Sequence, residues 1–186
     1  MITYEKYVKP FSGKFHLIKI EQESINKLNG FLNDLIELKK KESHHIIDFK
    51  SHFKRYYTGF LGEIALEQFL GIDGIVDWTI GNSDKYHTPD LKSIGLNIGV
   101  KTVNYGAFPI IFDQSYNPEI IMIKWKENYI YICGLATKKV LNEFQSKELI
   151  LDKNLREKGT KTGFYGFSEL VQFQNLDMLK ELTLNN

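Results

Sequence analysis

The sequence of 186 residues contains one cysteine, four prolines and only two arginines. The single cysteine, Cys133, excludes an internal disulfide and is typical of a reducing compartment. The scarcity of proline, without any low-complexity tract, excludes collagen-like and linker-rich chains. Apolar runs such as residues 109–112 and 120–123 are far too short to span a bilayer. The first residues lack the basic-then-apolar order of a signal peptide, so we expect a cytoplasmic protein with no membrane partner.

Positive charge is carried almost entirely by lysine, because Arg55 and Arg156 are the only arginines among 24 basic residues. The formal net charge of +1 neither requires nor excludes a nucleic-acid partner. Lysine is a mobile point charge suited to phosphates, whereas arginine is favoured for bidentate reading of guanine. If the chain binds nucleic acid, we therefore expect contacts mainly to the backbone. The alternative is that a composition rich in Lys, Ile and Asn reflects an A/T-rich coding genome.

Hydrophobic residues make up 42% and charged residues 25% of the chain, which is ordinary for one globular domain. Apolar residues spaced by three and four positions predict an amphipathic helix over residues 21–41. The same spacing predicts a second, centrally packed helix over about residues 46–70, ended by Gly71. We expect residues 1–45 to be an N-terminal helical extension packed on a core of residues 46–186, within a single domain overall.

Short strand patterns follow the second helix. The expected elements are a strand over residues 75–80, a hairpin of residues 90–94 and 96–103 around Gly95, a second hairpin of residues 119–125 and 129–135, a helix over residues 137–144 capped by Thr137, a strand over residues 163–167, and a closing helix capped by Ser168. Helices first, then antiparallel strands, then a helix and a strand indicate an α+β fold with a mixed sheet.

Familiar cofactor motifs are absent from the sequence. It contains no phosphate-binding glycine loop, no dinucleotide fingerprint and no cysteine pair for zinc. Cys133 lies in a predicted strand and is interpreted as a small core residue. One group of acidic and basic residues remains as a candidate site: Glu63, Asp90 and Lys101.

Glu63 interrupts the apolar part of the second helix, next to Gly62 and one turn after Gly59. A glycine inside a helix costs about 1 kcal/mol relative to alanine. A close approach of helix and sheet would offset that cost and bring the Glu63 carboxylate to the sheet surface. The alternative is a solvated glutamate beside glycines that serve packing only.

Asp90 follows Pro89 at the start of a predicted strand, and Lys101 lies within an apolar strand on the same face as Gly99. A lysine that is desolvated beside carboxylates can polarise a water molecule or stabilise a developing oxyanion. The alternative for Lys101 is an edge-strand lysine that prevents aggregation.

Pro89-Asp90 followed by Gly99-Val100-Lys101 resembles the motif of the PD-(D/E)XK nuclease superfamily, and residues 59–66 resemble its first core helix. In archaeal Holliday-junction resolvases that helix carries an additional acid, which Glu63 matches. The resemblance covers about residues 46 to 170. It implies a restriction-endonuclease-like core of helix, three strands, helix and strand, with an added N-terminal helix. The implied activity is hydrolysis of DNA phosphodiester bonds by a metal-dependent endonuclease of prokaryotic or phage type.

The resemblance also implies roles for individual residues. Asp90, Glu63 and the backbone carbonyl of Val100 would bind Mg²⁺ or Mn²⁺, which activates a water molecule for attack on phosphorus. Lys101 would position or deprotonate that water. Gly99 stands where the family has its second acid, so one ligand is missing from the usual pattern.

We expect Glu63 to take the place of the missing acid, because its helix lies close to the sheet. Asp113 or Glu119 folding over the site, or an inactive site, are the alternatives. Lys54, Arg55 and His87 are candidate DNA contacts, with solvated side chains as the alternative for each.

Two other functions stay open from the sequence. A catalytically inactive nuclease fold would serve as a nucleic-acid-binding module, and the 13% aromatic content would suit a protein-interaction module. A homodimer is an open alternative to a monomer.

Overall fold

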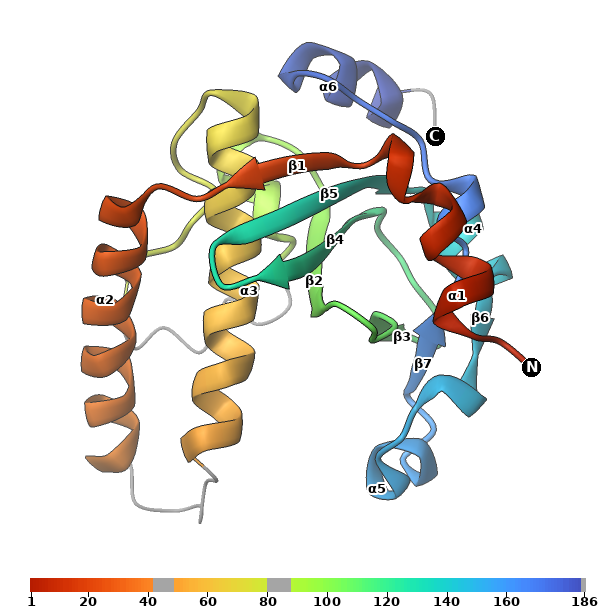
Figure 1. Cartoon of the computed structure of the whole chain (residues 1–186), viewed down its shortest axis with the longest axis horizontal. Helices are drawn as coiled ribbons and strands as arrows, with labels where there is room; N and C mark the ends of the chain where they lie inside the picture. The colour runs from red at the N-terminus through yellow and green to blue at the C-terminus, as the bar shows by residue number, and fades with distance from the viewer. Residues whose placement is uncertain (42–48, 80–87, 185–186) are drawn as a thin grey trace.

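The computed structural model of the chain describes residues 1–41, 49–79 and 88–184. It has an α+β fold with a mixed four-stranded sheet and a smaller antiparallel sheet (Figure 1). The four-stranded sheet has the order β1 (His16–Lys19), β5 (Tyr129–Ala136), β4 (Glu119–Lys126) and β2 (Gly99–Asn104). The smaller sheet has the order β3 (Ile110–Phe112), β7 (Lys161–Phe164) and β6 (Gln145–Ser146). The α+β class with a mixed sheet is therefore confirmed.

Helices flank the sheets on several sides. Figure 1 shows the two long helices side by side at one edge of the molecule, with the smaller sheet at the other edge. The α-helices are α1 (Tyr4–Tyr7), α2 (Gln22–Lys41), α3 (Phe49–Leu70), α4 (Lys138–Glu143), α5 (Lys153–Glu157) and α6 (Leu176–Leu184). The short 3-10 helices are η1 (Lys9–Lys14), η3 (Asp90–Ile94), η4 (Lys147–Leu149) and η5 (Phe167–Glu169). In the described parts of the chain, no helix has the length and apolar character needed to cross a membrane.

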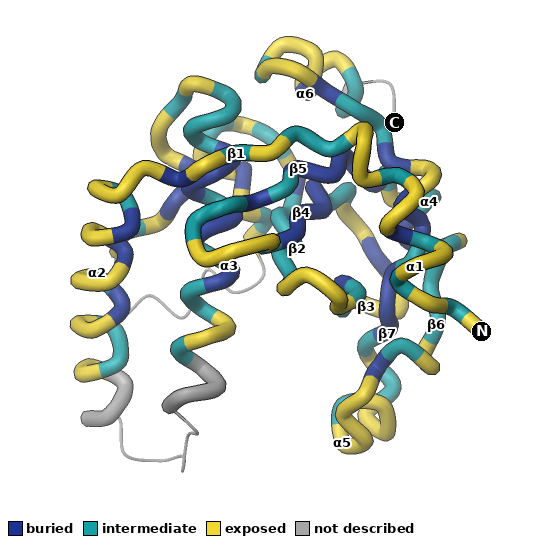
Figure 2. The backbone as a smooth tube through the Cα atoms, in the orientation of Figure 1, coloured by how far each residue is buried: buried dark blue, intermediate teal, exposed yellow. Residues whose placement is uncertain are grey.

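The predicted helices α2 and α3 are confirmed over the described residues. Leu28 and Leu32 of α2 are fully buried in the same core cluster as Leu61 of α3. Figure 2 shows buried positions on the sides of α2 and α3 that face the rest of the molecule. Gly71 ends α3 in a left-handed conformation with φ of 66°, as expected for a helix stop.

Residues of β4 alternate between two hydrophobic cores. Ile120 and Met122 pack in the cluster with α2 and α3, while Ile121 and Ile123 pack in a second cluster with Leu141 of α4. Burial of both faces explains why the strand reads as a continuous apolar run. Cys133 is fully buried in the second cluster, which confirms its interpretation as a core residue.

A close approach of α3 to β2 occurs at Gly62. A Cβ atom at this position would lie 1.8 Å from Oγ1 of Thr102, so only glycine fits. A Cβ at Gly59 would meet no atom of another element within 4 Å among the residues that the structure describes. The expected role of glycine in bringing helix and sheet together is therefore confirmed at Gly62 and wrong at Gly59.

The segment before β2 differs from its prediction. Residues 90–94 form η3 and not the first strand of a hairpin. The 3-10 helix is held by a backbone hydrogen bond to the segment that follows it, in which Leu91 N donates to Ile98 O at 3.0 Å. Gly95 ends the helix with a φ of 84°. β2 instead pairs in parallel with β4.

Two further predictions are wrong in the described residues. Residues 75–79 form no strand, and residue 80 lies outside the described residues. Ser168 lies in η5 and caps no closing helix. The helix α6 begins eight residues later, where Met178 N donates to Oδ1 of Asn175 at 2.9 Å.

Other local predictions are confirmed. β4 and β5 form the expected antiparallel hairpin, and α4 begins at its predicted cap, with Val140 N donating to Oγ1 of Thr137 at 3.3 Å. β7 overlaps the predicted last strand but begins two residues earlier. The N-terminal segment differs from the expected helical extension, because it contributes β1 as well as α2, and β1 pairs antiparallel with β5 of the main sheet.

Candidate functional site

The parallel register of β2 and β4 places Glu119 opposite Gly99. The atoms nearest to a Cβ built on Gly99 would be Cγ of Glu119 at 3.4 Å and Oδ2 of Asp90 at 3.6 Å. The space beside Gly99, which the second acid of the motif would enter, is thus bordered by two carboxylate side chains. One of them comes from the neighbouring strand.

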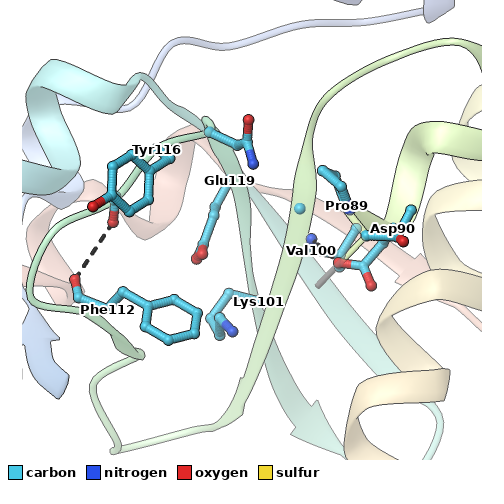
Figure 3. A pocket seen from close by; sticks show the side chains of 11 residues that line it. Pro89, Asp90, Val100, Lys101, Phe112, Tyr116 and Glu119 are labelled. Atoms are coloured by element: carbon cyan, nitrogen blue, oxygen red, sulfur yellow. Dashed lines mark hydrogen bonds between the residues drawn. The ribbon is translucent and has the colours of Figure 1, made fainter. Parts of the chain in front are cut away.

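These residues line a cavity of about 460 Å³ at the start of β2 and β4. In Figure 3 the Glu119 side chain extends toward Lys101, and Asp90 lies beside Val100 at the other side of the view. We call this space the first cavity; its principal lining residues are Asp90, Lys101, Phe112, Tyr116 and Glu119. The structure therefore brings the predicted residues Asp90, Val100 and Lys101 together.

Asp90 links η3 to β2. Its Oδ2 accepts a hydrogen bond from Val100 N at 2.5 Å. Although the residue lies at the surface, desolvation of its carboxyl group is the largest influence and raises the pKa above its ordinary value of 3.8. The bond from Val100 and the positive charge of Lys101 act in the opposite direction.

Glu119 contains an unsatisfied oxygen within the described part of the chain. Its Oε2 is buried and has no hydrogen-bond partner there. Burial raises the pKa of Glu119, with a smaller raising effect from Asp90 and a lowering effect from Lys101. A buried polar atom without a partner is rare and points to a bound water or ion. This carboxylate is therefore suited to receive a cation.

Glu63 lies in a second cavity, of about 550 Å³, which adjoins the first. Thr88, Pro89 and Asp90 line both cavities. Burial raises the pKa of Glu63 well above its ordinary value of 4.5, and the negative charge of Asp90 is the next cause. The structure thus brings Glu63 near Asp90, while the space beside Gly99 is bordered by Glu119.

The loop that forms one wall of the second cavity is held by Glu67. Its Oε1 accepts hydrogen bonds from the backbone N–H groups of Gly74, Ile75 and Val76 at 2.9, 2.8 and 2.9 Å. Ser93 Oγ of η3 donates to Gly74 O at 2.5 Å. These bonds connect α3, the loop and η3, so the elements that present Glu63 and Asp90 are fixed to one another.

A basic side chain that the sequence analysis missed lies near the first cavity. Lys161 of β7 pairs in register with Phe112 of β3. Burial lowers the pKa of Lys161, and the positive charges of Lys101 and Arg55 lower it further, while the negative charges of Glu119 and Asp113 raise it. Lys101 and Arg55 therefore both lie within electrostatic reach of Lys161. No sequence pattern marked Lys161, because β7 (Lys161-Thr162-Gly163-Phe164) contains a single apolar side chain and the predicted strand begins only at Gly163.

The first cavity is not lined by every residue that the sequence analysis proposed. Lys54 is exposed on α3 and lines neither the first nor the second cavity. His87 lies outside the described residues. Asp113, an alternative for the missing acid, is exposed and does not line the first cavity.

The carboxylate oxygens of the first cavity fit a hard divalent cation that needs few ligands from the protein. No three His, Cys, Asp or Glu side chains are grouped for metal binding in the residues that the structure describes. Mg²⁺ commonly uses only one or two protein carboxylates and keeps several waters. Asp90 and Glu119 supply two carboxylates, and Val100 also lines the cavity.

No protein-family model matches the sequence, and comparison with curated proteins and with solved structures yields no match. Function is therefore inferred from the two cavities and the residues that line them.

Proposed function

We propose that the protein is a metal-dependent nuclease that hydrolyses DNA phosphodiester bonds, with a restriction-endonuclease-like core. In this proposal Glu119 acts as the second acid of a PD-(D/E)XK site, from the strand next to the motif strand. The supporting observation is the position of the Glu119 side chain, 3.4 Å from a Cβ built on Gly99 and with one buried, unpartnered oxygen. Asp90 and Lys101 line the same cavity.

Asp90, Glu119 and the carbonyl of Val100 would hold Mg²⁺ or Mn²⁺ in the first cavity. When bound, the ion lowers the pKa of a water molecule and offsets charge on the phosphate. Glu63, in the adjoining cavity, adds negative charge beside Asp90 when it is ionised. The cluster of acids is therefore unfavourable without a cation and favours its binding.

The chain's own basic residues act on the phosphate and the attacking water. Lys101 lies near both carboxylates and would orient the water or accept its proton. Lys161 and Arg55 would neutralise phosphate charge at the side of the cavity, as in backbone-directed binding.

The test is nicking of supercoiled plasmid in Mg²⁺ and in EDTA. We expect metal-dependent nicking by the parent protein and a loss on the order of a hundredfold or more in Lys101→Met, because the aid to the attacking water is removed. DNA binding by Lys101→Met should remain within a few fold of the parent. Lys153→Met is the matched control, because Lys153 is exposed, lines neither cavity and forms an exposed ion pair with Glu157 at 3.7 Å.

Normal nicking by Lys101→Met would return Lys101 to the role of an edge-strand lysine. Nicking that persists in EDTA would contradict a metal-dependent site. Equal losses in Lys101→Met and Lys153→Met would indicate a general effect of charge on DNA binding.

A binding module without catalysis is the second candidate function. It is favoured by the absence of any group of three metal-ligand side chains among the residues with a described position. Calorimetric titration with Mg²⁺ separates the two functions. The nuclease requires Mg²⁺ binding that Asp90→Asn abolishes. The binding module requires DNA binding in the absence of Mg²⁺ binding.

A further inference from the structure

Two aromatic rings border the first cavity and remain exposed. Phe112, the last residue of β3, is 50% exposed, and Tyr116, four residues later, is 71% exposed. Figure 3 shows both rings on the side of the cavity where Glu119 lies. Single exposed apolar residues are normal on protein surfaces. Two exposed rings that line one cavity together with Glu119 and Lys101 are less common and indicate a binding surface.

The loop that carries the rings is fixed by α4. Ser115 N donates to Oδ1 of Asn142 at 2.8 Å, and Nδ2 of Asn142 donates to Ser115 O at 3.1 Å. Asp113 N donates to Thr160 O at 3.2 Å. Ser115 between the rings is buried. The backbone that carries the rings is thus held in place before any ligand arrives, which reduces the backbone entropy lost on binding.

Positive charge lies directly beside the Phe112 ring. Nζ of Lys161 is 3.0 Å from the centroid of the Phe112 ring. Arg55 and Lys101 are near enough to Lys161 to lower its pKa. Aromatic rings next to cations are the arrangement by which proteins bind single strands, since the bases stack on the rings and the cations contact phosphates. An apolar protein partner would instead have to desolvate these cations without pairing them.

We propose that Phe112 and Tyr116 form a stacking platform for unpaired bases next to the phosphate in the first cavity. The substrate is then single-stranded DNA or an unpaired segment of a duplex, an inference that rests on the proposed nuclease function. Bases within an intact duplex are stacked on one another and offer no free face to a ring. Binding of a duplex to the platform therefore costs the free energy of unstacking and unpairing its bases.

The test is fluorescence anisotropy in EDTA, so that binding is measured without cleavage. The probes are a labelled strand of about 12 nucleotides and the same strand in a blunt duplex. We expect the single strand to bind roughly tenfold more tightly than the duplex. Tyr116→Ala and Phe112→Leu should each weaken single-strand binding roughly tenfold, the effect typical of one lost stacking contact. Duplex binding should change little.

Two control variants separate stacking from other effects. Tyr116→Phe keeps the ring but loses the hydroxyl that donates to Oε1 of Gln114 at 3.2 Å, and it should bind like the parent. Trp125→Leu removes an exposed ring that also lies beside a lysine, with Nζ of Lys126 at 4.2 Å from its centroid. Trp125 does not line the first cavity, so its loss should leave binding unchanged. Thermal unfolding of each variant verifies the fold.

Equal affinity for strand and duplex, or equal binding by Tyr116→Ala and the parent, would overturn the platform. Plasmid nicking would still decide the nuclease separately. Self-association that Tyr116→Ala abolishes, without a preference for single strands, would assign the rings to a second copy of the chain and also overturn the platform. Absence of both nicking and DNA binding would overturn both proposals.

Discussion

At the scale of residues, side chains from two neighbouring strands, β2 and β4, can enter the same part of the first cavity. In parallel pairing Gly99 and Glu119 are direct neighbours, so a side chain at either position enters the same space. Glycine at position 99 leaves room for Glu119, whose Cγ lies 3.4 Å from where the Cβ would stand. A carboxylate in this position acts through its distance from Asp90 and Lys101. We infer that its strand of origin has little effect on its chemistry.

A relocation of the acid tests this inference. Glu119→Ala should reduce Mg²⁺ binding and nicking at least about 10–100-fold, the range typical even for loss of an outer-shell partner of a metal site. Gly99→Glu in the Glu119→Ala background should recover a large part of both, because it returns a carboxylate to the same space. Calorimetry and plasmid nicking measure the two effects.

Gly99→Gln in the same background is the matched control, since it restores volume without charge. Equal recovery by Gln and Glu at this position would show that packing alone was lost. Gly99→Glu in the parent should lower the free energy of unfolding, because three acids would then crowd one cavity.

At the scale of elements, local sequence patterns predicted α2, the described part of α3, the β4–β5 hairpin and α4. Each of these elements follows from periodicity or a cap within a short stretch. The 3-10 helix at residues 90–94 was not predictable in this way, because it is held by bonds to Ile98 and Val100. The pairing of Gly99 with Glu119 was not predictable either. It depends on a parallel register between strands that are separated by β3.

The two glycines of α3 offer a matched pair of substitutions. Gly62→Ala places a Cβ 1.8 Å from Oγ1 of Thr102 and should destabilise the fold by about 1–3 kcal/mol or more, as overpacking does. Gly59→Ala meets no atom within 4 Å and should stabilise it by up to about 1 kcal/mol through helix propensity. Denaturant unfolding measures both.

Thr102→Ala should partly rescue Gly62→Ala, because it removes the nearest atom while the Cβ at 2.9 Å remains. If Gly62→Ala were as stable as the parent, α3 would not need to lie against β2. The position of Glu63 would then lack its structural cause.

At the scale of the whole molecule, the fold holds three carboxyl groups at a cost in stability. The pKa of Glu63, of Asp90 and of Glu119 is raised in the folded protein, with burial as the largest cause for each. The folded state therefore binds more protons than the unfolded chain above the ordinary carboxyl pKa. Stability falls as the pH rises through that range. A bound cation would reverse this loss, because it stabilises the ionised groups.

Glu63 provides the clearest test of this cost. In EDTA, Glu63→Gln should be about as stable as the parent well below pH 4.5, where the carboxyl group is protonated in both the folded and unfolded states. Above that pH the variant should become the more stable protein. The difference should grow until the pH exceeds the folded pKa, by about 1.4 kcal/mol for each unit by which folding raises it. Denaturant unfolding at several pH values measures the difference.

Glu157→Gln is the control, because Glu157 is an exposed partner of Lys153 and contributes little to stability. Its difference from the parent should stay small at every pH. Mg²⁺ at neutral pH should stabilise the parent and do so less at pH 5, because the carboxyl groups must lose their protons before they bind the ion. If Glu63→Gln were less stable than the parent at neutral pH in EDTA, the carboxylate would be serving the fold. That result would contradict a role of Glu63 and the second cavity in metal-dependent chemistry.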